Sequence, residues 1–205
     1  MILDTSERIL NAAEVLFAER GFDAVSVREI TGQAQTNLAS VNYHFGSKNE
    51  LLDAVLHRRL GPINQRRMQQ LDLLLATQAK PELSEVLRAF LDPPFQTIQE
   101  MGTEDATFLR LLARIHLESN TTFTARLKAQ FNAVLSAFLP VLQSLLPDLT
   151  PEVLQQRLFF AIGSMSHAVA FALNRQTLGV AANPTAILDQ LIAFTTAGLS
   201  AGVKS

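Results

Sequence analysis

Helix start and stop signals follow one another at short intervals in the first 60 residues of this chain. Ser26 with Glu29 and Ser47 with Glu50 have the spacing of a capping box, in which a hydroxyl and a carboxylate satisfy free N–H groups at the start of a helix. Asn37 is a third residue of the kind that caps helices. Because each start must follow the end of a preceding helix, residues 26–46 can form only short helices joined by tight turns.

Apolar side chains recur at helical spacing from residue 4 to 20, which predicts the first helix. Residues 32–37 hold too little apolar material for a helix and predict a turn. The helix expected over residues 38–45 has only about two turns, so it must be held by packing through Val41 and Phe45. Its other face stays free to contact a ligand.

The rest of the chain also shows helical periodicity, and no segment alternates as a strand does. A long helix is expected from Ser47 onward, with Gly61-Pro62 kinking or splitting it. Prolines punctuate the chain beyond residue 76, and the apolar stretches between them predict helices over 82–100, 104–118, 121–146, 151–175 and 184–202. The sequence therefore predicts an all-α fold, with a three-helix unit over residues 1–47 and a larger helical bundle over residues 48–205.

Composition excludes several classes of protein. Hydrophobic residues make up 48% of the chain, which suffices for a core, and no apolar run is long enough to span a bilayer. No secretory signal opens the chain, so a cytoplasmic location without a membrane partner is expected. The chain has no cysteine, and its four histidines show no metal-ligand spacing, so no disulfide, metal or other cofactor is expected. The net charge of -2 argues against nonspecific electrostatic binding of nucleic acid.

Two short helices joined by a tight turn and preceded by a longer helix have the plan of a helix-turn-helix DNA-binding unit. The second short helix would then enter the major groove, where its polar side chains can meet bases or phosphates. These side chains are Ser40, Asn42, Tyr43 and His44. Lys48 adds a positive charge beside the free N–H groups at the start of the next helix. We therefore expect the N-terminal unit to bind double-stranded DNA.

The TetR family of bacterial repressors has a DNA-binding region that closely resembles the run ERILNAAEVLFAERGFDAVSVREITGQAQTNLASVNYHFGSKNELLDAVL, most specifically in LFAERGFDAVSVREI and YHFGSK. The resemblance implies contacts to base edges and to phosphates. The implied base contacts come from Leu38, Ala39, Ser40 and Asn42, and the implied phosphate contacts from Ser26, Tyr43, His44 and Lys48. Leu38-Ala39-Ser40 stands where relatives often have Lys-Gly-Thr, and Asn42 stands where they often have tyrosine. The operator sequence of relatives is therefore not transferable to this chain.

Other roles are open for several of these side chains. Tyr43 and His44 can instead complete the small core of the N-terminal unit. Ser26 is first a helix cap, with phosphate contact as a second use of the same hydroxyl. Arg28 is a further candidate for DNA contact, and its alternative is a solvated charge paired with Glu29.

Ten of the thirteen phenylalanines lie beyond residue 76. Each can be a core residue, but a bundle lined by phenylalanine and leucine also suits a cavity for an apolar effector with a few polar anchors. A lone histidine on an apolar helix is more often a core or interface residue than a ligand contact. The candidate ligand-binding residues are Phe90, Phe95, Phe108, Leu112, His116, Phe123, Phe160 and His167.

Residues 158–173 are apolar on nearly all sides, so a helix there must be covered on several faces. In a TetR-like chain the last two long helices pair with their copies across a two-fold axis, which here implies a homodimer through 151–175 and 184–202. The alternatives are burial within one monomer and a helix that lies on a membrane surface. NLASVNYHFGSK followed by LLDAVLHRRLGPIN is similar to a TetR subgroup linked to fatty-acid metabolism. A fatty acid or an acyl-CoA is therefore the first effector expected.

Together these features predict a transcriptional repressor, not an enzyme, that a small hydrophobic effector releases from a palindromic operator. Its half-sites would lie about one helical turn apart, roughly 34–36 Å. One alternative is a helical-bundle enzyme acting on an apolar substrate, since Gly163-Ser164-Met165-Ser166 precedes His167, although the GxSxG elbow is lacking. The other is a DNA-binding regulator that needs no effector.

Overall fold

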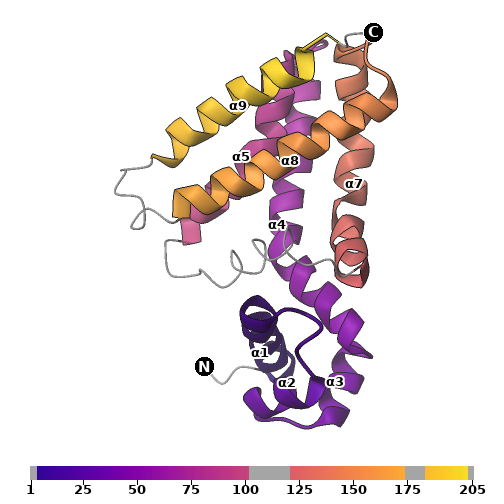
Figure 1. The fold of residues 1–205 in the computed structure, drawn as a ribbon, viewed down its shortest axis with the longest axis vertical. Coiled ribbons are helices and arrows are strands. Elements are labelled where there is room, and N and C mark those ends of the chain that lie inside the picture. The colour runs from indigo at the N-terminus through magenta and orange to yellow at the C-terminus, as the bar shows by residue number, and fades with distance from the viewer. Residues whose placement is uncertain (1–3, 102–120, 174–182, 203–205) are drawn as a thin grey trace. The chain divides into compact units, whose positions relative to one another are not determined.

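The computed structural model describes residues 4–101, 121–173 and 183–202, and within them the chain forms α-helices and no strand (Figure 1). The all-α prediction is thus confirmed for the described ranges. The helices are α1 (Thr5–Arg20), α2 (Val27–Gln33), α3 (Leu38–Phe45), α4 (Lys48–Thr77), α5 (Leu83–Met101), α7 (Thr121–Leu145), α8 (Pro151–Leu173) and α9 (Pro184–Ser200). The helix expected over 104–118 lies outside the described residues.

The capping residues and prolines of the sequence predicted where several helices begin. α3 spans the residues predicted for the second short helix, and α8 and α9 each begin at a proline, whose fixed φ suits the first helical position. Gly61-Pro62 does not split α4, which runs through Pro62. The missing N–H of Pro62 removes only the helix bond to the Arg58 carbonyl, and Pro62 itself lies exposed on the helix surface.

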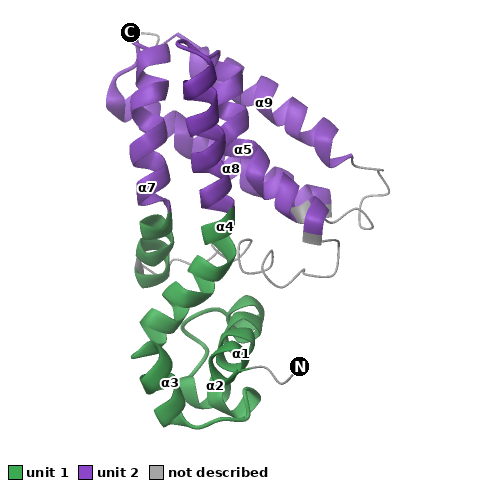
Figure 2. Ribbon diagram, turned by 180° about the vertical axis from the view of Figure 1, so that it is seen from behind, with its two compact units in different colours: residues 1–62, 105–130 green, residues 63–104, 131–205 purple. Residues whose placement is uncertain are grey.

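The chain divides into two compact units (Figure 2). Unit 1 comprises residues 1–62 and 105–130, and unit 2 comprises residues 63–104 and 131–205. Unit 1 therefore contains α1, α2, α3, the first half of α4 and residues 121–130 of α7. The predicted functional division after residue 47 stays a prediction, since compactness alone does not test it.

Unit 1 buries apolar residues of α1, α2, α3, α4 and the start of α7. α1, α2 and α3 pack against one another in pairs. The rings of Phe17 and Phe22 lie 5.4 Å apart between centroids. The fully buried side chains include Ile9, Ala13, Phe17, Ile30, Val41, Leu51, Leu52, Val55 and Leu56.

A buried ion-pair cluster joins α1 to α4 within unit 1. Glu14 on α1 is 2% exposed, and both of its carboxylate oxygens are taken by arginines of α4. Arg59 Nε donates to Glu14 at 2.7 Å, and Arg58 donates to the other oxygen. Removing either arginine would leave part of a buried charge without its partner, which is costly.

Unit 2 has a separate aromatic and aliphatic core. α5 packs against α8 and α9, and α8 packs against α9. The rings of Phe90 on α5 and Phe138 on α7 meet edge to face, with centroids 5.2 Å apart. Among the described residues, no helix is long and apolar enough to cross a membrane.

One buried polar side chain interrupts the apolar face of α4 in unit 2. Ile63, Arg67 and Leu71 follow one another at four-residue spacing, and all three are at most 3% exposed. Arg67 Nε donates to the Phe90 carbonyl at 2.8 Å. In a regular helix this carbonyl would accept from residue 94, which is a proline without an N–H. Arg67 therefore satisfies the carbonyl that Pro94 leaves free.

The chain turns sharply between α3 and α4 at Gly46. Its φ is +81°, a conformation that residues with a side chain rarely adopt. A Cβ at this position would also overlap with the carboxylate of Glu50. The end of the short helix α3 thus depends on a glycine.

We expect Gly46→Ala to lower the free energy of unfolding by about 1–3 kcal/mol, because it forces a strained backbone conformation. Gly32→Ala is the matched control, since Gly32 lies within α2 and an added Cβ meets nothing within 4 Å. That control should raise the stability by about 0.5–1 kcal/mol. Urea denaturation followed by circular dichroism measures both, and equal effects of the two substitutions would contradict the role assigned to Gly46.

Candidate DNA-binding site

The structure fixes both ends of α3. The side chain of Asn37 accepts a hydrogen bond from the Ser40 N–H at 3.0 Å, which caps the start of the helix as predicted. The Gly46 N–H donates to the Asn42 carbonyl and closes the end. Val41 is the buried residue of the helix, with no exposed surface.

Phe45, expected to pack with Val41, is half-buried, and five other residues of α3 are exposed. Tyr43 is 86% exposed and Leu38 is 43% exposed, and Ala39, Asn42 and His44 are exposed as well. The rings of Tyr43 and His44 meet edge to face, with centroids 5.0 Å apart. Because both rings are exposed, the alternative that they complete the small core is wrong.

The side chain of Ser40 already makes hydrogen bonds within the protein, which the sequence did not predict. It is half-buried, and its hydroxyl donates to Asn37 Oδ1 at 3.2 Å and accepts from the Thr36 hydroxyl at 2.9 Å. A hydroxyl oxygen has a second lone pair, so Ser40 retains capacity for one further contact.

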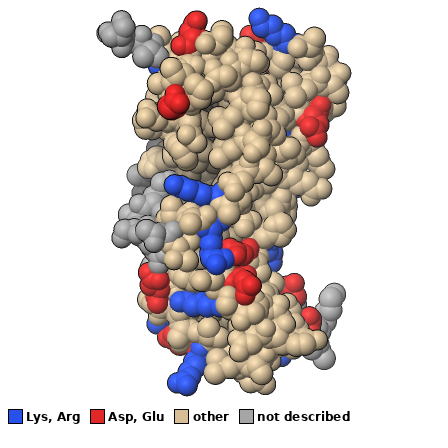
Figure 3. Space-filling model, turned by 90° about the vertical axis from the view of Figure 1, so that its right-hand side faces the viewer, with Lys and Arg blue, Asp and Glu red and all other residues tan. Residues whose placement is uncertain are grey.

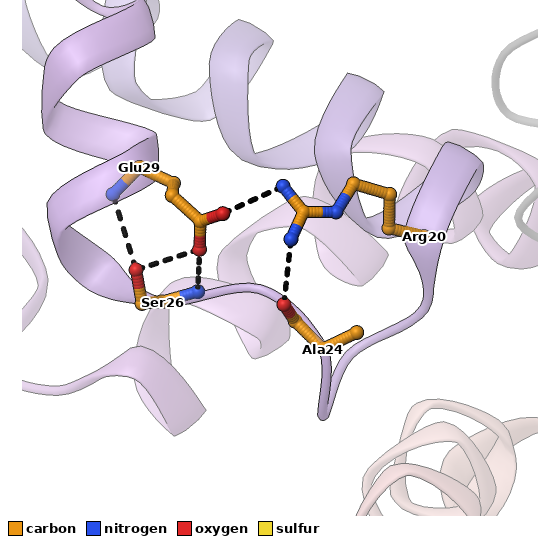
Figure 4. A network of polar contacts seen from close by, with 4 residues as sticks. All are labelled: Arg20, Ala24, Ser26 and Glu29. Atoms are coloured by element: carbon orange, nitrogen blue, oxygen red, sulfur yellow. Dashed lines mark hydrogen bonds and ion pairs between the residues drawn. The ribbon is translucent and has the colours of Figure 1, made fainter.

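The predicted capping box at the start of α2 is complete (Figure 4). Glu29 Oε2 accepts from both the N–H and the hydroxyl of Ser26 at 2.7 Å, and the Glu29 N–H donates to Ser26 Oγ at 3.3 Å. Arg20 adds an ion pair of 2.6 Å to Glu29 and donates to the Ala24 carbonyl at 3.0 Å. Arg20 thereby ties the end of α1 to the start of α2.

These donors stabilise the ionised form of Glu29. The hydrogen bonds from Ser26 and then the contact with Arg20 lower the pKa of Glu29 from 4.5 to about 2. Arg28 is exposed, and the carboxylate beside it is occupied by Arg20. The alternative that Arg28 pairs with Glu29 is therefore wrong.

Lys48 begins α4 and is held against an aromatic ring. Its Nζ lies 4.2 Å from the centroid of the Phe22 ring. Burial lowers the pKa of Lys48, while the charges of Asp23 and Glu29 oppose this shift. Lys48 thus lies at the start of α4, as the sequence predicts, with its Nζ against the Phe22 ring.

The first 60 residues carry no excess of positive charge, with six Lys or Arg against eight Asp or Glu. On the face drawn in Figure 3, basic and acidic side chains are interspersed, and uncharged residues form much of the surface around them. Any binding of DNA must therefore come from a few well-placed groups. Within the described ranges, no cluster of three His, Asp or Glu side chains could hold a metal ion.

The predicted ligand-binding residues fall into different environments. Phe90 and Phe95 are buried in unit 2, and Phe123 is buried in unit 1. Phe160 is 72% exposed and His167 is also exposed. The remaining three candidates, Phe108, Leu112 and His116, lie outside the described residues. A ligand-binding role for these eight residues stays a prediction.

Sequence reasoning missed three charged residues that organise the units: Arg20, Glu14 and Arg67. A signal for Arg67 was available, since it occupies the helical stripe between Ile63 and Leu71 where an apolar residue is expected. Glu14 and Arg20 pair with residues of other helices, so their partners could be identified only in three dimensions.

Two family models match the chain. One, described as bacterial regulatory proteins of the tetR family, matches residues 9–55, and the other, described as a tetracyclin repressor-like C-terminal domain, matches residues 88–198. The second match alone covers more than half of the chain. The chain belongs to the TetR family.

Individual relatives match parts of the chain. The Transposon Tn10 TetC protein of Escherichia coli is 32% identical over 88 residues, which are 43% of this chain and 43% of that protein. The HTH-type transcriptional repressor BdcR of Escherichia coli K12 is 46% identical over 55 residues, which are 27% of this chain and 28% of BdcR. The matched segments thus span less than half of the length of these relatives.

The fold is similar to that of a solved regulator along almost the whole chain. The structure of FadR from Bacillus subtilis in complex with stearoyl-CoA superposes with a TM-score of 0.62 and 18% identity, covering 94% of this chain and 98% of FadR. At this identity the likeness shows the fold alone.

The capping box predicts an acid-sensitive contribution to stability. Because the folded-state pKa of Glu29 is depressed from 4.5 to about 2, its contribution is fully present above about pH 4.5 and is lost as the pH falls through about 2. We expect Glu29→Gln to be less stable than wild type at pH 7, with the difference shrinking between pH 4.5 and 2. The measurement is chemical denaturation across this range, with Glu82→Gln at an exposed position of unit 2 as the control. A difference that stays constant down to pH 2 would contradict the assignment.

Proposed function

We propose that the chain is a dimeric transcriptional repressor that binds an operator through α3 and is released from it by a hydrophobic small molecule. The observation that carries this proposal is the exposure of α3, which buries Val41 and turns its polar side chains outward. A short capped helix exposed in this way within a three-helix unit is the form in which helix-turn-helix proteins read the major groove. BdcR, a relative over this part of the chain, is named as a repressor.

Asn42 is the side chain best suited to read sequence. It is exposed in the middle of α3, and an amide can pair with the N6 and N7 groups of adenine. Leu38 and Ala39 offer apolar contacts to thymine methyl groups, and Ser40 retains one acceptor position. Specificity would then come from hydrogen bonds and methyl contacts, because none of these residues carries a charge.

The phosphate contacts would position the helix. Ser26, Tyr43 and His44 are exposed polar groups, and Lys48 is a cation at the start of α4. Arg28 is a further exposed cation on α2. With so few cations on each protomer, we propose that binding depends only modestly on salt, since the salt dependence follows the number of phosphates neutralised.

DNA binding is tested by selecting duplexes from a random library with the full chain and measuring their affinity by fluorescence anisotropy. We expect Asn42→Ala to weaken binding at least about tenfold, because one paired base contributes about 1–3 kcal/mol of discrimination. Asn132→Ala is the matched control, since Asn132 is exposed on α7 in unit 2. Equal affinity of wild type and Asn42→Ala for the selected duplex would contradict base reading by α3.

A homodimer through α8 and α9 is supported by the exposed surfaces of these helices. Phe160 on α8 is 72% exposed and Phe194 on α9 is 67% exposed. A Cβ added at Gly163 or Gly198 would meet nothing within 4 Å, which leaves room for a second backbone to approach. We propose that a second copy of the chain covers these faces, and that Phe160 serves this interface rather than a ligand.

Phe194→Glu should shift the protein from dimer to monomer, raising the dissociation constant of the dimer at least about a hundredfold, because a buried aromatic anchor is replaced by a charge. Leu73→Glu is the control, since Leu73 is an equally exposed apolar residue, at 66%, on α4. Light scattering during size-exclusion chromatography measures the mass of each variant. A Phe194→Glu protein that remains dimeric at low micromolar concentration would refute this interface.

The effector is proposed to be a fatty acid or an acyl-CoA. Unit 2 has a core rich in phenylalanine and leucine, which suits an apolar ligand. FadR, whose fold is similar, has been solved with stearoyl-CoA. Release would follow if the ligand binds one conformation of the dimer and DNA binds the other, so that the two binding events oppose each other. Operator affinity that is unchanged at saturating ligand would instead support the regulator without an effector.

A further inference from the structure

Arg67 is the charged side chain that lies buried among the described residues of unit 2, with 1% of its surface exposed. Its Nε donates to the Phe90 carbonyl at 2.8 Å, and Nη1 donates to Asn64 Oδ1 at 2.7 Å. Nη2 lies 3.5 Å from the sulfur of Met165. All three partners are neutral. Within the residues that the structure describes, the ion pairs of unit 2 involve other arginines.

The bond to Phe90 explains why a donor lies here but not why the donor is a cation. A neutral amide would satisfy the carbonyl equally well. A guanidinium has five N–H groups, and one of the three contacts uses a sulfur, which is a weak acceptor. Burial lowers the pKa of Arg67 from 12.5 to about 9, so the group is still protonated at neutral pH. A buried charge without an opposite charge is costly, and an anion would relieve that cost.

The surroundings of Arg67 suit an anion attached to an apolar chain. Its Cζ lies 4.9 Å from the centroid of the Phe90 ring and 5.4 Å from that of Phe131. Two aromatic faces stabilise a cation and at the same time offer contact to hydrocarbon. A single carboxylate matches the fork of a guanidinium, since both oxygens can accept at once.

The other described arginines of unit 2 are already engaged. Arg66 pairs with Glu100 at 2.5 Å and Arg88 pairs with Asp189 at 2.8 Å. Arg157 donates to backbone carbonyls at the end of α9. An acyl-CoA carries its negative charge on several phosphates and none on the thioester beside the acyl chain. Among the described residues of unit 2, Arg67 is the buried cation without an ion pair, and its one charge fits a free carboxylate better than a CoA thioester.

We propose that Arg67 binds the carboxylate of a free long-chain fatty acid, and that the effector of this chain is the free acid and not its CoA thioester. This inference rests on the hydrophobic effector proposed above and narrows its chemical class. The interaction is an ion pair with hydrogen bonds, in which no covalent bond changes. The carboxylate would neutralise the charge that is otherwise buried against neutral groups.

Three ligands with the same hydrocarbon chain test the inference on the wild-type protein. Palmitate, hexadecanol and palmitoyl-CoA are each titrated into the full chain at neutral pH by isothermal titration calorimetry. We expect palmitate to bind at least about tenfold more tightly than either of the other two, since a charge-assisted hydrogen bond is about twice as strong as a neutral one. Because this comparison uses no variant, it holds even if substitution of Arg67 impairs folding.

Variants then assign the preference to Arg67. Arg67→Gln retains a donor for the Phe90 carbonyl but removes the charge, and it should bind palmitate and hexadecanol equally. Arg67→Lys keeps the charge without the fork and should retain part of the preference. Arg88→Gln is the matched control on the surface of unit 2 and should bind as the wild type does.

Two results would overturn the inference while leaving the proposed regulator intact. One is equal or tighter binding of hexadecanol or palmitoyl-CoA to the wild type. The other is a folded Arg67→Gln protein that still prefers palmitate. If none of the three ligands binds the protein or releases it from the selected duplex, the inference fails together with the proposed fatty-acid effector. Failure of the protein to bind any duplex would contradict only the DNA-binding proposal.

Discussion

A helix of about two turns does not remain folded in water through its own hydrogen bonds, and unit 1 is organised around this constraint. Val41 anchors α3 to the core, Asn37 caps its start, and Gly46 ends it with a positive φ. Since these three positions hold the helix, most of its other side chains can be exposed. Tyr43, at 86% exposed, is one of them.

Charged contacts between helices hold the frame around α3. Glu14 forms ion pairs with Arg58 and Arg59, which join α1 to α4. The ion pair between Arg20 and Glu29 joins the end of α1 to the start of α2. In unit 2 the buried charge of Arg67 has no ion pair among the described residues. Its Nε donates to the Phe90 carbonyl, which lacks a helical partner because Pro94 has no N–H. Glu14, the buried charge among the described residues of unit 1, is paired with two arginines, whereas Arg67 has neutral partners. That contrast leads to the proposed carboxylate ligand.

Helix boundaries and caps were predictable from the sequence, because Asn37, Ser26 and Glu29 act on groups within three residues. Long-range pairs were not predictable, because Glu14 and Arg58 are 44 residues apart and Arg67 and Met165 are 98 apart. The exposure of Tyr43 could not be decided from the sequence, since an aromatic residue on a short helix suits a core as well as a groove.

Contact between α3 and DNA can be measured directly by placing the photoreactive amino acid p-benzoylphenylalanine at position 43 and irradiating the complex with the selected duplex. Tyr43 is highly exposed, so the replacement adds a phenyl ketone to an aromatic ring already at the surface. The same amino acid at position 73 is the control, since Leu73 is also well exposed, at 66%, on α4 in unit 2. A crosslink to DNA from position 43 and none from position 73 is expected. Bound duplex that crosslinks from position 73, or from neither position, would contradict DNA recognition by α3.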